Sequence, residues 1–290
     1  MRFVYLNGEF IPENEAKISV FDRGFLYGDG IFETVRAYDG AVFRLDRHIE
    51  RLFSSAEILS LTLPHSPERF CGIVQETLRL NGLSNAVVRL SVTRGAGAGG
   101  ISTVHCPRPT VLCSAREIPA GQDMKQKGGV QAVIVKTRRT PPECLDSRAK
   151  TFNFLNNIMA KIEADGAGAF EGIMLTTDGK LAEGTVSNVF FCRRGELCTP
   201  SVNTGILSGI ARETVLEIAA GLGLKPREGL FDPGELRAAG EIFLTNSNWE
   251  VLPVVGLDGQ AVGAGAPGEI TSALAAGYTA LTRKESGACR

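Results

Sequence analysis

The alternation of apolar and polar residues predicts β-hairpins and amphipathic helices in an irregular order. Near the start, Phe3–Leu6 and Glu9–Ile11 flank Asn7-Gly8, and a second pair of apolar runs flanks Asp39-Gly40. Both dipeptides suit the tight turn of a β-hairpin. The next segment has the apolar period of a helix, for which Asp46 is the expected N-cap. Its predicted apolar face holds Ile49, Leu52, Phe53, Ala56 and Leu59.

The same mixture continues through the rest of the chain. Helices are expected over residues 67–81, 152–164, 209–221 and 268–284, and strands over residues 86–93, 109–116, 130–136, 241–245 and 251–255. Because neither half shows a regular strand–helix–strand alternation, the pattern predicts the α+β fold class. The turn-rich segment from Ile118 to Asp123 is the best domain boundary. We therefore expect one domain over residues 1–118, a linker over 119–125 and a second domain over 126–290.

Composition excludes several classes of protein. The 290 residues include 31 Lys and Arg and 32 Asp and Glu, for a net charge of −1, and no basic block is present. Such a chain is a poor nucleic-acid binder. The first ten residues do not resemble a signal peptide, and no apolar run approaches the ~20 residues of a membrane helix. The seven cysteines show no metal-binding spacing. We expect no metal site, reduced thiols and a cytoplasmic location.

Three segments carry candidate chemistry. Lys150 precedes a predicted helix, where the macrodipole disfavours its charge and favours a nucleophilic amine. Glu183 lies among small polar residues between two predicted strands. The run from Gly205 to Arg212 enters a helix whose free amides could bind a phosphate. Each residue could instead be an ordinary surface or capping residue.

Gly95, Gly97 and Gly100 match the glycine spacing of a dinucleotide-binding turn, which leaves a nicotinamide oxidoreductase as an alternative. That motif also needs a helix opening at the third glycine. The residues that follow, from Ile101 to Pro107, do not form a helical pattern. A flexible loop is the simpler interpretation.

The order of the motifs along the chain resembles the class IV pyridoxal-phosphate aminotransferases. The likeness spans almost the whole chain, from Tyr5-Leu6-Asn7-Gly8 to Leu252-Pro253-Val254. Its specific motifs are Tyr27–Glu33, Phe43–Leu52 with Ser55-Ala56, Lys150–Leu155, Ala182-Glu183-Gly184 with Ser187-Asn188, and Gly205–Arg212. The resemblance implies a small N-terminal α/β domain and a larger C-terminal pseudobarrel domain. It also implies that the cofactor binds between them and that a homodimer or higher homo-oligomer completes the site.

Residue roles follow from this resemblance. Lys150 is similar to the lysine that forms a Schiff base with pyridoxal phosphate, Glu183 to the acid at the pyridine nitrogen, and Arg51 to the phosphate-binding arginine. Ile210 and Ala211 match the helix-start amides that contact the phosphate, and Ser247 matches a second phosphate-binding turn. The implied cofactor site also includes Ser187, Asn188, Leu207 and Gly209. The implied substrate contacts are Tyr27, Phe32, Arg89, Ser247 and Asn248.

Within this family, the sequence is most similar to the branched-chain aminotransferases. Such an enzyme moves the amino group of leucine, isoleucine or valine to 2-oxoglutarate by a ping-pong mechanism. A D-amino-acid transaminase and a 4-amino-4-deoxychorismate lyase are the alternatives within the family, and a non-catalytic cofactor-binding relative is a third. The segment between Gly95 and Cys106 carries no arginine. The D-amino-acid enzymes are expected to use an arginine and a histidine there, and His105 is misplaced for that role.

Four positions depart from the branched-chain pattern. Thr34 stands where a glycine is usual, and Phe154 stands where a tyrosine often contacts the cofactor. Val87 replaces a tyrosine that contacts the substrate carboxylate in some members, although Arg89 is retained two residues later. Ala211 replaces a usual threonine, so that only its backbone amide can bind phosphate. These changes affect the choice of substrate more than the class of chemistry.

Overall fold

The chain, seen in a computed structural model, forms two compact units. The structure describes residues 1–97, 99–106, 108–118 and 121–288. The first unit comprises Met1–Ile118, Ala149–Asn153 and Thr282–Arg290, and the second comprises Pro119–Arg148 and Phe154–Leu281. The short segment Ala149–Asn153, which contains Lys150, thus belongs to the same unit as the N-terminal third. The boundary expected over residues 119–125 stays a prediction.

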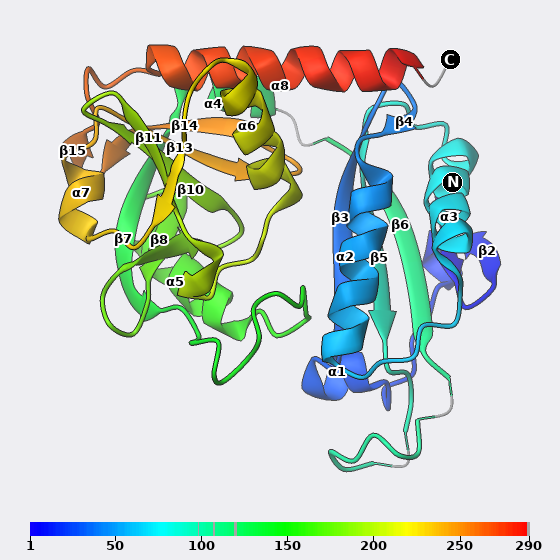
Figure 1. The fold of residues 1–290 in the computed structure, drawn as a ribbon. Helices are drawn as coiled ribbons and strands as arrows, with labels where there is room; N and C mark the ends of the chain where they lie inside the picture. The colour runs from blue at the N-terminus through cyan, green and yellow to red at the C-terminus, as the bar shows by residue number, and fades with distance from the viewer. Residues whose placement is uncertain (98, 107, 119–120, 289–290) are drawn as a thin grey trace. The chain divides into compact units, whose positions relative to one another are not determined.

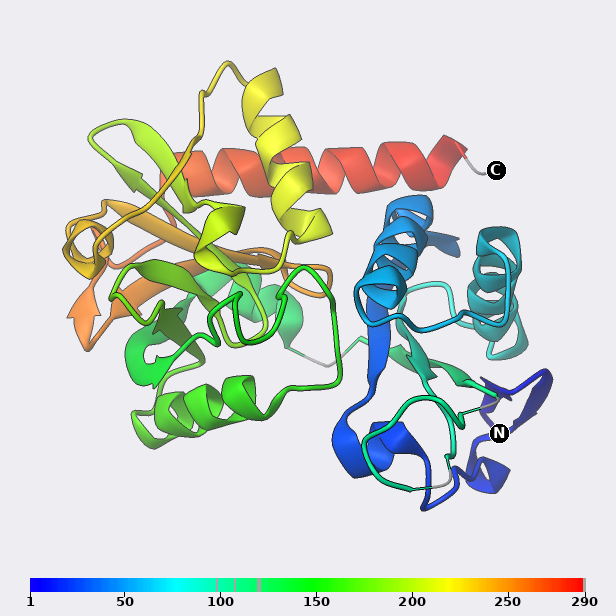
Figure 2. The same cartoon turned by 60° about the horizontal axis from the view of Figure 1, so that its bottom comes forward.

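The first unit is built on a six-stranded antiparallel sheet with the order β2-β1-β6-β5-β3-β4. Its strands are β1 (Phe3–Leu6), β2 (Glu9–Pro12), β3 (Gly30–Tyr38), β4 (Ala41–Val42), β5 (Ala86–Thr93) and β6 (Thr110–Glu117). The helices α2 (Leu45–Ile58) and α3 (Pro67–Leu80) lie side by side and pack on this sheet (Figures 1 and 2). Both hairpins predicted from the sequence are present.

The start of α2 differs from the expectation. The N-cap is Arg44, in the left-handed conformation with φ 52°, and Asp46 lies inside the first turn. The prediction of Asp46 as the cap is therefore wrong, because the chain turns directly from β4 into the helix. An acidic residue in the first turn still stabilises the positive end of the helix. The predicted apolar residues Ile49, Leu52 and Ala56 are buried in the core.

The two faces of the first sheet have different roles. Side chains alternate along a strand, so Ile31, Glu33 and Val35 share one face of β3, and Phe32 and Thr34 share the other. Ile31 and Val35 belong to the core beneath α2 and α3. In the register of β3 and β5, Thr34 pairs with Arg89. Arg89 therefore lies on the same face as Phe32, opposite the helices.

The second unit contains a nine-stranded sheet with the order β12-β11-β10-β13-β14-β7-β8-β9, and β15 pairs with β14 (Figure 1). Although β9 ends this order, it also contacts β10, which shows that the sheet curls on itself. The mixture of helices and sheets in both units confirms the predicted α+β fold class. The strands are β7 (Val130–Arg138), β8 (Glu171–Leu175), β9 (Leu181–Gly184), β10 (Asn188–Arg193), β11 (Glu196–Pro200), β12 (Arg227–Gly229), β13 (Glu241–Asn246), β14 (Glu250–Leu257) and β15 (Gln260–Ala261).

The other helices are α1 (Arg23–Tyr27), α4 (Gln122–Gly128), α5 (Leu155–Gly166), α6 (Ile210–Gly221), α7 (Pro233–Arg237) and α8 (Glu269–Ala288). The sequence did not predict α4, because its polar residues follow a turn signal and carry no apolar period. In the described part of the chain, no helix is both long and apolar enough to cross a membrane.

Candidate active site

Lys150 lies in an extended segment along the edge of β3, and not at a helix start. The Phe32 amide donates to the Lys150 carbonyl at 3.0 Å, and the Phe152 amide donates to the Gly30 carbonyl at 2.9 Å. This edge is open because β4 pairs only with Ala37 and Tyr38. The pairing delays α5 until Leu155, whereas the sequence predicted a helix from residue 152. The macrodipole argument for Lys150 therefore fails, because strand pairing fixes its position.

The Lys150 amine has an aromatic and cationic environment. Its Nζ lies 4.5 Å from the centroid of the Phe32 ring, and the Arg89 Cζ lies 3.6 Å from the same ring. The Arg89 side chain reaches solvent, yet desolvation by its surroundings lowers the pKa of its guanidinium. Within the described residues, no carboxylate pairs with Arg89. A partly desolvated guanidinium near a primary amine is suited to bind an anionic group of a small molecule.

Arg51 is held by a buried carboxylate. Its Nε donates to the Glu33 Oε1 at 2.7 Å, and one terminal nitrogen donates to Oε2 at 2.7 Å. His48 Nδ1 lies 2.7 Å from the same Oε2. Arg51 and His48 lower the pKa of Glu33 to about 2, against the desolvation that acts in the opposite direction. The phosphate-binding role of Arg51 stays a prediction, but its guanidinium is held in a fixed orientation by Glu33.

Glu183 has a corresponding cluster in the second unit. It is buried, and its Oε1 accepts a hydrogen bond from Arg139 Nε at 2.7 Å. Its Oε2 accepts from the Leu207 amide at 3.1 Å and from Asn188 Nδ2 at 3.4 Å. A guanidinium and two amide donors stabilise the ionised form of the carboxylate. Arg139 was not predicted from the sequence, because Arg138-Arg139 has the pattern of an exposed charged pair.

Ser187 and Asn188 organise this cluster. The Ser187 hydroxyl donates to the Glu171 Oε2 at 2.9 Å, and Asn188 Nδ2 donates to the Leu207 carbonyl at 2.9 Å. A Cβ on Gly209 would come within 2.1 Å of the Asn188 Oδ1, so this contact requires a glycine. Asn188 therefore holds the segment from Leu207 to Gly209 next to Glu183. Direct contacts of Ser187, Asn188, Leu207 and Gly209 with a cofactor stay predictions.

The start of α6 provides amide donors for an anion. Gly209 is the N-cap and supplies no side-chain hydrogen bond, so the first amides of the helix, at Ile210 and Ala211, have no side-chain cap. Nearby in the sheet, Thr245 pairs with Asn188, and its buried Oγ1 has no hydrogen-bond partner among the described residues. A buried hydroxyl without a partner indicates a missing ligand or water. These groups fit a phosphorylated cofactor.

Ser247 and Asn248 lie in the turn that joins β13 to β14. Asn246 Oδ1 accepts the amides of Asn248 and Trp249, at 2.9 Å and 2.8 Å, which fixes the turn. Gln122 also donates to the Asn248 carbonyl. This turn directly follows Thr245, so the predicted second phosphate turn and the partnerless hydroxyl share one segment. Thr245 was not predicted from the sequence, because a threonine in a strand carries no signal of its own.

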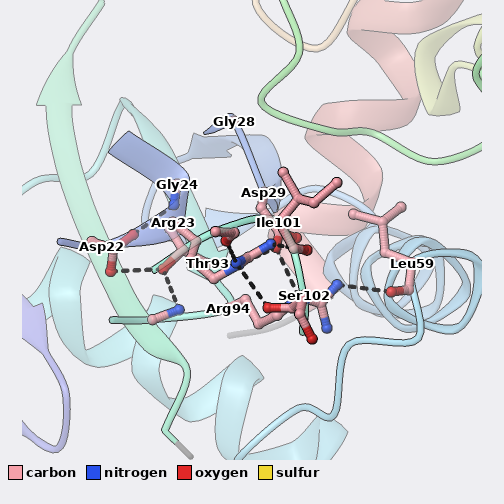
Figure 3. Close-up of polar contacts among 12 residues, drawn as sticks. Asp22, Arg23, Gly24, Gly28, Asp29, Leu59, Thr93, Arg94, Ile101 and Ser102 are labelled. Carbon is pink, nitrogen blue, oxygen red and sulfur yellow. Dashed lines mark hydrogen bonds and ion pairs between the residues drawn. The ribbon is translucent and has the colours of Figure 1, made fainter. Parts of the chain in front are cut away.

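The glycine-rich loop does not bind a nucleotide in the way its spacing suggested. No helix opens at Gly100. Instead, the carbonyls of Ile101 and Ser102 accept hydrogen bonds from the buried Arg23 guanidinium at 3.0 and 3.1 Å (Figure 3). The Gly100 carbonyl accepts a third hydrogen bond from this guanidinium at 2.8 Å. A phosphate needs converging N–H groups, whereas these carbonyls converge on a cation. Within the described residues, the nicotinamide alternative has no support.

Arg23 also connects this loop to Tyr27, a predicted substrate contact. The Arg23 Cζ lies 5.0 Å from the centroid of the Tyr27 ring. Asp29 accepts hydrogen bonds from Arg23 Nε at 2.7 Å and from Arg94 Nε at 2.8 Å (Figure 3). The two arginines share one carboxylate at the start of β3. None of these three residues was predicted as functional, because single charged residues give no signal in one sequence.

Comparison with known proteins gives a consistent result. Residues 30–257 match the family model described as amino-transferase class IV. A putative branched-chain-amino-acid aminotransferase of Methanocaldococcus jannaschii is 42% identical over 273 residues, which are 93% of this chain and 93% of that protein. An aminodeoxychorismate lyase of Bacillus subtilis is 38% identical over 93% of this chain and 92% of that protein.

Two further similarities bear on the substrate. A D-alanine aminotransferase of Bacillus licheniformis is 35% identical over 92% of this chain and 93% of that protein. The crystal structure of a branched-chain aminotransferase from Thermoproteus uzoniensis with norvaline has a TM-score of 0.90, at 35% identity over 97% of this chain and 94% of that chain. These similarities extend over nearly the full length of the chain.

Proposed function

Because the chain belongs to the class IV aminotransferase family, we propose that it transfers the amino group of branched-chain L-amino acids to 2-oxoglutarate. Enzymes of this family depend on pyridoxal phosphate, so the chain is a pyridoxal-phosphate-dependent aminotransferase. The observation that carries the proposed substrate is Arg89. It offers a partly desolvated guanidinium on the same sheet face as Phe32, whose ring also contacts the Lys150 amine.

The residues of both clusters have roles in this proposal. Lys150 would hold the cofactor through its amine, and Glu183 would serve the ring nitrogen, while Arg139 holds the Glu183 carboxylate in place. Arg51, the amides of Ile210 and Ala211, and Ser247 bind the phosphate. The buried Thr245 hydroxyl has no hydrogen-bond partner among the described residues, which supports the binding of a polar ligand near Ser247.

When bound, the cofactor supplies an electron sink for the bonds at the substrate Cα. The Lys150 amine would serve as the general base for the substrate Cα proton and as the general acid that returns it. Glu183, held by Arg139, would stabilise a proton at the ring nitrogen, which deepens the electron sink. Because one oxo acid would have to leave before the next one binds, we expect ping-pong kinetics.

Arg89 would pair with the substrate carboxylate. The same face of the sheet presents the Phe32 ring and the Val87 side chain, two residues from Arg89 along β5. An apolar wall beside one cation suits an amino acid with a hydrocarbon side chain. This combination favours leucine, isoleucine or valine over a dicarboxylic substrate in the first half-reaction.

A D-amino-acid transaminase or an aminodeoxychorismate lyase is the second candidate. The specific observation is Phe154, which forms the N-cap of α5 and has no hydroxyl to bind a phenolic oxygen. Thr34, opposite Arg89 in the sheet, also departs from the branched-chain pattern. The similarity to a lyase at 38% identity and to a D-alanine aminotransferase at 35% identity agrees with these departures.

A homodimer is the minimal assembly in this proposal. In α5, the buried residues are Ala160 and Ala164, whereas the larger apolar side chains are exposed. Their exposed fractions are 71% for Leu155, 50% for Ile158, 49% for Met159 and 59% for Ile162. The spacing of these four residues places them on one side of the helix. An exposed apolar stripe of this kind favours contact with another protein surface.

The experiment is an absorbance titration of the protein loaded with pyridoxal phosphate. We expect L-leucine to bleach the visible band of the bound cofactor and 2-oxoglutarate to restore it. Bleaching by D-alanine alone would replace the L-amino-acid assignment with the D-amino-acid one. Pyruvate release from aminodeoxychorismate without an oxo-acid acceptor would instead identify a lyase. Lys150→Ala serves as the control, because it should abolish the band altogether.

A further inference from the structure

Glu171 is a buried carboxylate that neither the sequence motifs nor the proposed reaction uses. It begins β8, and its exposed fraction is 0%. We propose that Glu171 is a positioning residue that fixes the turn between β9 and β10, and thereby places the Glu183 carboxylate. The assignment rests on the proposed function, since it gives Glu183 its role at the cofactor ring nitrogen.

The carboxylate of Glu171 lies inside the turn and accepts four hydrogen bonds. Its Oε1 accepts from the Gly172 amide at 2.9 Å, from the Thr185 amide at 3.1 Å and from the Thr185 hydroxyl at 2.5 Å. Its Oε2 accepts from the Ser187 hydroxyl at 2.9 Å. All four donors are N–H or O–H groups of neutral residues. A buried carboxylate satisfied in this way is a fixed template for the backbone around it.

This turn connects Glu183 to Asn188, the two side chains that the candidate cofactor site takes from β9 and β10. Glu183 is next to its start, Asn188 directly follows it, and the Gly184 amide closes it onto the Ser187 carbonyl at 2.7 Å. A Cβ on Gly184 would lie 3.1 Å from the Glu171 Oε2 and 2.1 Å from the Ser187 Oγ. A glycine is therefore required at residue 184 mainly by the close approach of the Ser187 hydroxyl, which is one of the donors to Glu171.

The acceptor character of Glu171 is the property that the turn needs. A glutamine at this position has nearly the same shape, but one of its two polar groups is a donor. At the Oε1 position that donor would face the Gly172 and Thr185 amides, which can only donate. At the Oε2 position it would face the Ser187 hydroxyl, which would have to turn and accept, so the turn would lose a charge-assisted hydrogen bond in either orientation. Glu183 and Asn188 would then lose their common geometry, although every residue that touches the cofactor would still be present.

The first test compares Glu171→Gln with wild type, both loaded with pyridoxal phosphate. We expect kcat to fall about tenfold with KM changed less than about twofold, because a misplaced Glu183 weakens the sink without altering substrate contacts. We also expect the pH dependence of the visible band to change, since the charge at the ring nitrogen influences the titration behind that band. An unaltered kcat and band in a folded Glu171→Gln protein would overturn the proposal.

Thr199→Val is the matched control for simple destabilisation. Thr199 is also fully buried, and its hydroxyl donates at 2.8 Å to the carbonyl of Val189, which lies one residue after Asn188 and outside the turn. We expect this variant to lower the thermal stability of the second unit while the band and kcat stay as in wild type. If Thr199→Val with a matched loss of stability reproduced the effects of Glu171→Gln, Glu171 would be merely structural and the proposal would be wrong.

A double-mutant cycle shows whether Glu171 acts through Glu183. If it does, Glu171→Gln should slow a Glu183→Gln enzyme no further, because the placement of a missing carboxylate has no effect. Multiplicative losses in the double variant would contradict this. Should Glu171→Gln not fold, Thr185→Val removes one donor with little change of shape, and we expect kcat to fall about threefold. Wild-type kcat and band in Thr185→Val would then overturn the proposal.

Failure of the proposed function has a different outcome. If wild type formed no visible band with pyridoxal phosphate, or if Lys150→Ala retained it, the roles of Lys150 and Glu183 would be wrong before any Glu171 variant was measured. If wild type behaved as proposed and only the Glu171 results disagreed, the positioning role alone would fail.

Discussion

At the residue scale, two arginines of the candidate site each pair with a buried carboxylate. Glu33 holds Arg51, and Arg139 holds Glu183. Glu33 is almost fully buried, with 1% of its side chain exposed, and three hydrogen bonds from Arg51 and His48 compensate its desolvation. Removing one partner of a buried pair leaves the other charge unpaired, which costs about 3–5 kcal/mol. Glu33 therefore combines a stabilising role with a positioning role.

The depressed pKa of Glu33 predicts a specific pH dependence of stability. Arg51 and His48 hold this pKa at about 2 in the folded protein, below the 4.5 of an unperturbed glutamate. The contribution of Glu33 is thus complete above pH 4.5 and is lost as the pH falls toward 2. This is tested by measuring the free energy of unfolding with denaturant at a series of pH values. For Glu33→Gln, this free energy should be lower than in wild type at neutral pH and should fall less steeply as the pH is lowered.

Glu76→Gln provides the control for this pH series. Glu76 also pairs with an arginine, Arg79, but on the exposed surface of α3. Solvent screens such a pair, so the unfolding free energy of this variant should follow the wild-type curve. A Glu33→Gln curve parallel to wild type at all pH values would show that Glu33 is not the titrating group.

At the element scale, the glycine-rich loop forms no regular element over its described residues 99–106, and three of its carbonyls converge on one side chain, Arg23. The glycines permit this path: Gly95 has φ 81°, and a Cβ there would lie 1.8 Å from the Arg108 carbonyl oxygen. The physical reason for the glycine at residue 95 is therefore the close approach of the Arg108 backbone and a positive φ, and not the binding of a nucleotide phosphate.

Removal of the Arg23 guanidinium should loosen this loop. For Arg23→Met, we expect faster amide hydrogen exchange across residues 99–106, while the strands of the first sheet keep their protection. Arg116→Met is the control, because Arg116 pairs with Glu13 at the surface and touches no loop carbonyl. Equal exchange of residues 99–106 in wild type and Arg23→Met would show that other contacts order the loop.

At the scale of the whole molecule, the sequence predicted the fold class, both hairpins and most helices because these have a strong period or a turn signal. It did not predict the placement of Lys150, since the pairing of Ala149–Asn153 with β3 is a long-range contact with no local signature. For the same reason, the sequence did not predict the roles of Arg139, Glu171 and Thr245. Their roles depend on the residues that contact them in the folded chain. Local patterns identify elements, whereas the site depends on contacts between distant segments.

The exposed stripe of α5 leads to the last prediction, which concerns the assembly. Leu155, Ile158, Met159 and Ile162 are each about half exposed or more, in a helix whose buried residues are alanines. A helix packed only on its own unit should bury its large apolar residues. We therefore expect Ile158→Glu to shift the protein from dimer to monomer in sedimentation velocity, because a carboxylate would be desolvated in the contact.

The control for this assembly test is Leu222→Glu, at the C-cap of α6. Leu222 is 52% exposed, similar to Ile158, but it does not belong to the α5 stripe. Its substitution should leave the dimer intact. A monomeric wild type would contradict the homodimer, and a dimeric Ile158→Glu with wild-type affinity would place the interface on another surface. If Ile158→Glu is monomeric and also loses the cofactor band, the assembly contributes to the cofactor site as well as to stability.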